Sequence, residues 1–158
     1  MSDWLDKLLS LFCVKMNSKR KGNITELAIA LAFQKLNIAV SIPFGDCERY
    51  DMIVDIKGKL YKIQCKTASY RRGDTSKISF SCRSTSTKHG QTVHHTYDES
   101  EVDFFAAYFP ENDKCYLVPI QEVSCEKTLR LVPPLNNHSN VNMAEDYELE
   151  KVVKERIL

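Results

Sequence analysis

Three polar residues on two neighbouring segments are spaced so that they can share one site. Asp51 lies in a mostly apolar segment, and Gln64 and Lys66 alternate in the next one. Side chains two residues apart on a β-strand point to the same face of the sheet. A carboxylate, an amide oxygen and an ammonium group at one place suit phosphodiester hydrolysis, because Mg²⁺ prefers oxygen ligands and an ammonium group offsets phosphate charge.

The turn between the two segments sets their pairing. Lys57-Gly58 predicts a two-residue hairpin turn in which glycine takes the positive φ that such turns require. The resulting register places Asp51 directly opposite Gln64, with Cβ atoms about 4.5–5.5 Å apart, and makes Lys66 a diagonal neighbour. It also separates a largely apolar face from a mostly polar one. A shift by one residue would mix the two sets, so the hydrophobic pattern supports the register.

Each of these residues has an expected role. Asp51 is the expected central metal ligand, with the Gln64 carbonyl oxygen as a neutral second ligand. Lys66 either lowers the pKa of the attacking water or stabilises charge developing on the phosphate. Glu26, on a predicted helix before the hairpin, completes the metal environment or orients water. Each residue also has a plainer interpretation as a solvated surface group, and Asn23 with Glu26 also fits a capping box at a helix start.

Hydrophobic periodicity and turn residues predict the elements that position these groups. A helix is expected from about Asn23, or slightly earlier, to Leu36. Further elements are a long polar loop from residue 84 to about 102, a short helical turn at 119–123, a charged helix at 144–157, and strands at residues 38–43, 50–56, 60–67, 77–83, 104–109, 114–118 and 128–132. One sheet with flanking helices predicts an α/β or α+β fold.

An apolar segment, residues 4–14, sets the N-terminal extension 1–16 apart from the rest. Asp3 and Asp6 accompany its start and no small-residue cleavage site follows, so an amphipathic helix is favoured over a signal peptide. A packing or oligomer contact is favoured over a membrane-surface role. Residues 17–158 are expected to form a single nuclease domain, and no segment approaches the roughly 18 apolar residues of a membrane span.

The six cysteines predict a reducing compartment. Four of them lie in strand-like apolar segments, and there is no CxxC pair or Cys/His spacing typical of a zinc site. Reduced, mostly buried thiols in a cytoplasmic protein are therefore expected.

Charge is distributed unevenly although the net charge is only +1. From residue 57 to 90, nine Lys or Arg residues stand against one acid, about +8, and from 98 to the end thirteen acids stand against six bases, about −7. Because this basic segment also contains Gln64 and Lys66, a polyanion partner is predicted. The residues expected to contact duplex DNA are Lys19, Arg20, Lys21, Arg71, Arg72, Lys77, Arg83 and Lys88.

The order of the candidate residues resembles the PD-(D/E)XK nuclease superfamily. That pattern is a helical Glu, then an Asp opening a hairpin, then a strand with [D/E/Q]-x-Lys, which is matched here by Glu26, Arg49-Tyr50-Asp51 and Gln64-Cys65-Lys66. Longer segments resemble the group I intron-associated homing endonuclease branch. They are residues 17–22, 43–45, 49–51, 64–67, 116–119, 129–131, 133–134 and 144–147.

The resemblance implies a restriction-endonuclease-like mixed sheet flanked by helices and metal-dependent cleavage of double-stranded DNA. It carries over Glu26, Asp51, Gln64 and Lys66 as the catalytic set, with Mg²⁺, or Mn²⁺ as a substitute, bound by the first three. Tyr50 stands where the name-giving proline would be, and Gln64 replaces an acid, as it does in the resembled branch. Because one active site cuts one strand, a homodimer or tetramer is expected, with the terminal helices as contacts.

Two other functions stay open. One is a non-cleaving DNA-binding or scaffold protein whose nuclease site has decayed. The other is a repair or recombination nuclease that reads DNA structure instead of sequence. Within the endonuclease hypothesis, homing and restriction-like roles are both compatible with the sequence.

Overall fold

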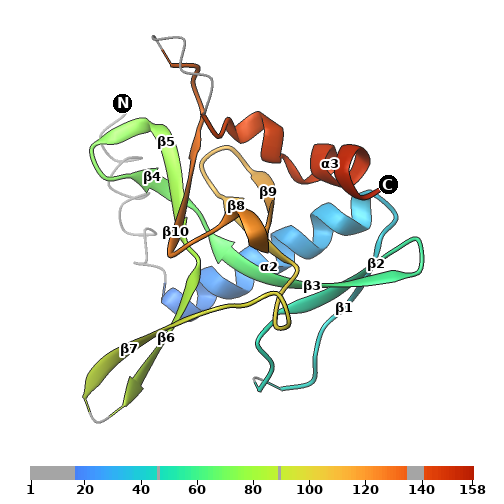
Figure 1. Ribbon diagram of the computed structural model, residues 1–158, viewed down its shortest axis with the longest axis horizontal. Coiled ribbons are helices and arrows are strands. Elements are labelled where there is room, and N and C mark those ends of the chain that lie inside the picture. The colour runs from blue at the N-terminus through green and yellow to red at the C-terminus, as the bar shows by residue number, and fades with distance from the viewer. Residues whose placement is uncertain (1–16, 46, 89, 135–140) are drawn as a thin grey trace, which may run out of the picture.

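The computed structural model describes residues 17–45, 47–88, 90–134 and 141–158. Its largest sheet has five strands in the order β1-β2-β3-β8-β9 (Figure 1). These are Ala39–Ser41, Met52–Ile56, Lys59–Thr67, Phe104–Phe109 and Lys114–Pro119. Neighbouring strands are antiparallel except for β3 and β8, which run parallel. A mixed sheet with flanking helices confirms the predicted fold class.

The predicted hairpin register is confirmed. Strand β2 pairs with β3 so that Met52 faces Ile63 and Ile56 faces Lys59. Gly58 in the turn has φ +81°, the left-handed region that favours glycine. Met52, Ile56 and Ile63 are buried on one face of the sheet, as the alternation of apolar residues predicts.

The connection between β3 and β8 carries four strands, which belong to two smaller sheets. One has the order β10-β5-β4, comprising Glu126–Arg130, Asp74–Ser81 and Ser69–Arg71. The other is a two-stranded ribbon of β6, Arg83–Lys88, and β7, Gln91–Thr96, which extends away from the main body at the lower left of Figure 1. Strand β10 begins two residues earlier than predicted, and β4 was not predicted.

The expectation of a long polar loop from residue 84 to 102 is wrong, because β6 and β7 occupy most of it. The ribbon lacks the alternation of apolar and polar residues that marks a half-buried strand. Its threonines favour extended backbone, and Gly90, with φ +76°, allows the tight turn between the strands. Hydrogen bonding, not burial, therefore defines this element.

Helix α2, Ser18–Lys35, lies across one face of the five-stranded sheet (Figure 1). It begins five residues before Asn23, because the Asn17 side chain caps it by accepting from Lys19 N at 3.0 Å. Asn23 thus lies inside the helix, and the capping-box interpretation of Glu26 is wrong. The helix ends as predicted, with Asn37 at φ 58°.

The face of α2 that packs on the sheet differs from the one that the helical spacing of the apolar residues indicates, which comprises Ile24, Leu27, Ala28, Leu31, Ala32 and Leu36. Thr25, Ile29 and Phe33 are buried, whereas Leu27 and Leu31 are 68% and 54% exposed. The helix carries apolar residues on more than one side, so spacing alone does not select the buried side. The structure leaves an exposed apolar ridge on its outer surface.

The predicted continuous helix at 144–157 is wrong in detail. The segment consists of a 3-10 turn, Ala144–Tyr147, a short helix α3, Leu149–Val152, and a π-helical turn, Val153–Ile157. Glu148 breaks it with φ −55° and ψ 131°, because its backbone forms an isolated β-bridge with Tyr116 of β9. The predicted helical turn after β9 is confirmed as the 3-10 turn Ile120–Glu122.

The five-stranded sheet is buried on both faces. On β8, Ala106 packs with the α2 side, while Phe105 and Ala107 pack on the opposite side. The cluster on the α2 side includes Ile29, Phe33, Val54, Ile63, Leu117 and Val152, and the opposite cluster includes Ile78, Phe80, Phe105, Leu129 and Tyr147. This double burial fixes β3 and its polar side chains between two packed layers.

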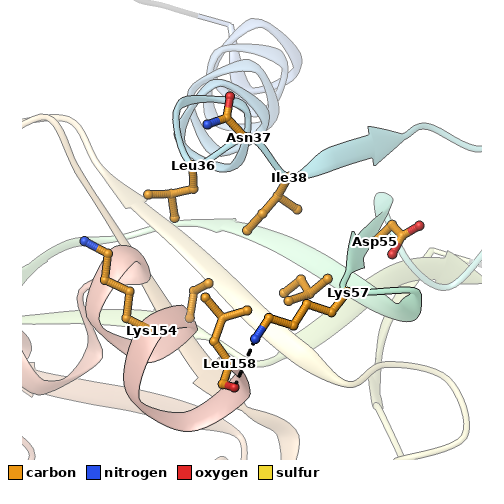
Figure 2. A pocket seen from close by; sticks show the side chains of 9 residues that line it. Leu36, Asn37, Ile38, Asp55, Lys57, Lys154 and Leu158 are labelled. Atoms are coloured by element: carbon orange, nitrogen blue, oxygen red, sulfur yellow. Dashed lines mark hydrogen bonds between the residues drawn. The ribbon is translucent and has the colours of Figure 1, made fainter.

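A cavity of about 250 Å³ lies between the end of α2, the β2–β3 turn and the C-terminal turns (Figure 2). Leu36 and Ile38 line it, and Lys57 Nζ donates to the Leu158 carbonyl oxygen at 3.4 Å across its edge. It adjoins the Ile56 end of β2, which is the opposite end from Asp51. The candidate chemistry therefore lies elsewhere.

The N-terminal extension, residues 1–16, and its expected amphipathic helix lie outside the described residues. In the part of the chain that is described, none of the helices combines the length and the apolar character needed to cross a membrane.

Replacing Ile63 by alanine is expected to lower the free energy of unfolding by about 2–5 kcal/mol, because its fully buried side chain would leave a cavity. Leu60→Ala on the same strand is the matched control. Its side chain is 63% exposed, and its removal should change stability by no more than about 0.5 kcal/mol. Urea unfolding measures both, and equal losses would contradict the assigned buried face.

Candidate active site

Asp51 lies directly before β2, and two N–H donors from β3 hold its carboxylate. Its Oδ2 accepts from Gln64 Nε2 at 2.5 Å and from the Cys65 backbone N–H at 2.6 Å. Asp51 N donates to the Ile63 carbonyl oxygen at 2.9 Å, which extends the hairpin register past the strand. Gln64 is only 8% exposed, so amide and carboxylate meet away from bulk solvent.

The pKa values of Asp51 and Lys66 both depart from the ordinary values of these groups. Burial raises the pKa of Asp51, although the Cys65 N–H, the charge of Lys66 and the Gln64 amide oppose this. Burial also lowers the pKa of Lys66, which the charge of Asp51 opposes. These opposite shifts are what desolvation produces in an acid and a base. Both groups therefore carry a desolvation cost that their mutual attraction offsets only in part.

The Lys66 ammonium group is held from the side of the ribbon. Its Nζ donates to the Arg83 carbonyl oxygen at 3.2 Å and lies 5.4 Å from the centre of the Tyr97 ring. Cys65, between Gln64 and Lys66, points to the other face, where burial raises the pKa of its thiol well above the ordinary range. A protonated thiol is a poor metal ligand, which leaves oxygen donors as the relevant ones.

Glu26 and Asp51 line one cavity of about 280 Å³ at the edge of the sheet. Glu48 and Tyr50 also line it, whereas Gln64 and Lys66 do not. Asp51 therefore joins two halves of the candidate site, one on the cavity and one on β3. Glu48 is a carboxylate that the sequence analysis missed, and its position three residues before Asp51 was the only available signal.

A side-chain hydrogen bond fixes α2 against the end of β3. Thr25 Oγ1 and Thr67 Oγ1 are 2.6 Å apart, and Thr25 is only 2% exposed. Glu26 follows Thr25 and Lys66 precedes Thr67, so this bond sets the position of the helical acid relative to the lysine strand. Its burial makes the arrangement costly to change.

The oxygen donors fit a divalent cation such as Mg²⁺. Within the described part of the chain, no three His, Cys, Asp or Glu side chains are grouped closely enough to hold an ion by themselves. Mg²⁺ usually takes only one or two protein carboxylates and completes its shell with water and substrate oxygens. Asp51 supplies a half-buried carboxylate, and Glu26 and Glu48 supply oxygens on the cavity that all three line.

Gln64 meets that requirement only in a different orientation. Its Nε2 faces Asp51, and an amide can bind a cation only through its oxygen. Binding of a cation between Asp51 and Gln64 therefore requires the Gln64 amide group to rotate by about half a turn, so that its oxygen faces Asp51.

Arg49 links the site to the β6–β7 ribbon, a connection that the sequence analysis missed. Its Nε donates to Glu101 Oε1 at 2.8 Å, its Nη1 to Ser84 Oγ at 2.9 Å and its Nη2 to the Thr96 carbonyl oxygen at 3.0 Å. The guanidinium carbon lies 4.2 Å from the centre of the Tyr97 ring. One side chain, two residues before Asp51, thus contacts both strands of the ribbon.

Three of the basic residues predicted to contact DNA lie in the first turn of α2. Lys19, Arg20 and Lys21 are exposed there, and this turn contains no acid. Cations at a helix N-terminus oppose the helix dipole by about 0.3–1 kcal/mol each. An anion bound beside them would relieve this repulsion.

The other five lie on the smaller sheets. Arg71 and Arg72 are exposed at the turn between β4 and β5, whereas Lys77 forms an ion pair with Asp74 at 2.9 Å. Arg83 begins β6, and its Nε is buried without a hydrogen-bond partner among the described residues. Lys88 ends β6. The β4–β5 turn and the ribbon lie well apart in Figure 1, so the predicted basic residues do not form one cluster.

The pKa shift of Asp51 predicts how stability responds to a neutral replacement. Because the folded-state pKa lies above that of the unfolded chain, ionised Asp51 costs stability at neutral pH, and this cost disappears as pH falls below about 4. Asp51→Asn should therefore unfold at a higher urea concentration than wild type at pH 7, with the gap closing toward pH 4. A variant less stable than wild type at pH 7 would contradict the assigned effect of burial.

A comparison with solved structures matches a bacterial homing endonuclease, I-Ssp6803I. The match has a TM-score of 0.69 and 24% sequence identity, and it covers 90% of this chain and all of the other. This likeness supports the fold. Among curated proteins, no sequence matches.

Membership of a family rests on a separate comparison. The family model described as PD-(D/E)XK endonuclease matches residues 16–150, which is most of the chain and includes Glu26, Asp51, Gln64 and Lys66. The protein belongs to the PD-(D/E)XK endonuclease family.

Proposed function

We propose that this protein is a metal-dependent endonuclease that hydrolyses phosphodiester bonds in double-stranded DNA, with Glu26, Asp51, Gln64 and Lys66 as its active site. The observation that carries the proposal is the half-buried contact between Asp51 and Gln64, with Lys66 on the same face of β3 and a cavity lined by Glu26 next to Asp51. Membership of an endonuclease family supports it.

In the proposed reaction, the oxygen of water forms a new bond to phosphorus and gives up one proton to solvent, while the P–O bond to the leaving oxygen breaks and that oxygen gains one proton. Asp51, Glu26 and the Gln64 oxygen would hold Mg²⁺, or Mn²⁺ in its place. The bound ion supplies positive charge that lowers the pKa of a coordinated water and offsets phosphate charge.

Lys66 is suited to act on the phosphate. Its ammonium group is held by the Arg83 carbonyl oxygen and attracted by the charge of Asp51, so its position is set before substrate binds. Burial lowers its pKa, which makes the ammonium group a better proton donor than an exposed lysine. We assign it stabilisation of charge on the phosphate and the leaving oxygen.

The basic residues supply affinity for the duplex in this proposal. Lys19, Arg20 and Lys21 lie in the same helix as Glu26 and would contact phosphates near the cut. Arg71 and Arg72 are exposed and would contact phosphates farther along. Lys77 contributes least, because Asp74 already offsets its charge.

A homo-oligomer, at least a dimer, is part of the proposal because one active site cuts one strand. The apolar ridge with Leu27 and Leu31 supports association, since large exposed apolar residues are costly in an isolated chain. The structural likeness to a homing endonuclease favours a homing or restriction-like role over repair.

Duplex cleavage tests the active site. Wild type with Mg²⁺ should nick or linearise a plasmid library, and EDTA should abolish cleavage. Lys66→Ala and Asp51→Asn should each lower the rate by about 100-fold or more, because the first removes the positive charge at the phosphate and the second removes the carboxylate that would hold Mg²⁺. Lys62→Ala is the matched control, since Lys62 lies on the same strand and face but donates to the Ser100 carbonyl oxygen instead.

Three results would contradict this assignment. Normal cleavage by both site variants would mean that the chemistry lies elsewhere. An equal loss in Lys62→Ala would indicate a general need for positive charge on β3. Duplex binding by wild type without cleavage in Mg²⁺ or Mn²⁺ would favour the scaffold function.

Gln64→Glu tests whether this position binds metal. The change removes the N–H donor to Asp51 and brings two carboxylates together, so the variant without metal should melt at a lower temperature than wild type. Mg²⁺ should raise its melting temperature more than that of wild type, because the added charge strengthens metal binding. Equal responses to Mg²⁺ in the two proteins would show that residue 64 is not a ligand.

A further inference from the structure

The β6–β7 ribbon is an element with no core of its own. Its six residue pairs run from Arg83–Thr96 to Lys88–Gln91, and neither strand pairs with another sheet. Two-stranded hairpins are marginally stable alone. Such an extended element needs either an anchor in the protein or a surface to lie against, and the structure supplies the anchor.

The anchor is the active site itself. Arg49 donates to Ser84 Oγ on β6 and to the Thr96 carbonyl oxygen on β7, and Lys66 Nζ donates to the Arg83 carbonyl oxygen. The base of the ribbon is therefore bonded to the lysine of the site and to a residue two positions from Asp51. Its tip, at Gly90, lies at the far end of both strands.

The chemistry of the ribbon excludes most kinds of partner. Residues 83–96 contain no Asp or Glu, and six of these fourteen residues are Ser or Thr. Of the large apolar side chains that the described residues expose, none belongs to the ribbon. A lipid surface and the core of a protein interface are apolar, whereas hydroxyl and imidazole groups suit a polar, hydrogen-bonding surface.

The two faces of the ribbon differ. Ser84, Ser86 and Val93 share one face and are half-buried, and Arg49 contacts this face. Thr85, Thr92 and His94 lie on the opposite face and are exposed. Thr85 and His94 face each other across the strands, with Oγ1 and Nδ1 3.4 Å apart. The outward face therefore presents donors and acceptors to solvent.

We infer that the ribbon enters the major groove of the DNA and reads base edges with Thr85, Thr92 and His94. The major groove admits a two-stranded β-ribbon, and hydroxyl groups bond either kind of base pair while the threonine methyl contacts thymine. The inference rests on the proposed function, because it is the duplex at the active site that the ribbon would contact.

The anchor also sets where the read bases lie. Six residues at about 3.3 Å each make the ribbon about 17–20 Å long. Base pairs are spaced by about 3.4 Å, so the ribbon spans about five or six of them. The base pairs read by this face are therefore expected within about six base pairs of the cut. The hydrogen bonds of Arg49 and Lys66 to the base of the ribbon keep the distance between the cut and these base pairs constant.

Selection of binding sites tests the inference without requiring cleavage. The full-length protein is incubated with randomised duplexes in EDTA, bound DNA is sequenced, and selected duplexes are compared by gel shift. His94→Ala and Thr92→Ala should each lower discrimination about five- to tenfold at one or two adjacent positions. His95→Ala is the matched control, because His95 is exposed on the other face and contacts Ser86 instead. It should change discrimination by less than about twofold.

The outcomes separate this inference from the proposed function. Sequence preference that depends on His94 in a protein that never cuts would support the ribbon and overturn the nuclease. Cleavage by wild type with unchanged preference in His94→Ala and Thr92→Ala would overturn the ribbon alone. Equal losses in His94→Ala and His95→Ala would overturn the assigned face. A loss of affinity that is uniform over all sequences would mean phosphate contact and would overturn base reading. Thermal melting confirms that each variant is folded.

Discussion

A half-buried carboxylate and a half-buried ammonium group on neighbouring segments of one hairpin are the constraint around which this structure is built. Asp51 and Lys66 each lose solvation, and the shift of each pKa shows that the protein does not fully compensate the loss. The Gln64 amide and the Cys65 N–H hold the carboxylate from β3. Such uncompensated charge is what a site for a cation and a phosphate requires, because ligand binding supplies the missing compensation.

The remaining elements keep this pair in place. Packing on both faces of the sheet fixes β3, and the hydrogen bond between Thr25 and Thr67 holds α2 at its end. Arg49 and Lys66 both lie against the Tyr97 ring, on the segment that follows the ribbon. Burial raises the pKa of Tyr97, so its phenol stays neutral and its ring serves as a platform for the two cations. The candidate active site and the ribbon are thereby parts of one network.

The part of the site within one hairpin could be predicted from the sequence. The segments that carry Asp51 and Gln64 are joined by a two-residue turn. The alternation of apolar residues in these segments permits only one register. Arg49 could not be assigned in the same way, because its partner Glu101 is separated by 52 residues and lies in a segment without periodicity. Local turn chemistry and burial leave a pattern in the sequence, whereas a polar network between distant segments leaves none.

The fold was predictable to the same extent. The sequence predicted the strands that have one buried face and the turns between them. The structure confirms the two central hairpins, β2–β3 and β8–β9. The errors fall where tertiary contacts override local preference. The bridge between Glu148 and Tyr116 interrupts a sequence that favours continuous helix, and the sheet selects the Ile29 and Phe33 side of α2 over the one with Leu27 and Leu31.

The parallel pairing of β3 with β8 has an evolutionary consequence. A parallel pair needs a long crossover, and here that crossover carries β4, β5, β6 and β7. Insertions and deletions in the crossover leave the register of the five-stranded sheet unchanged, because they do not move the ends of either strand. The ribbon can therefore lengthen, shorten or change its side chains during divergence while the residues that end β3 stay the same. If the ribbon reads bases as proposed, such a lineage can acquire new target sites and keep the proposed reaction.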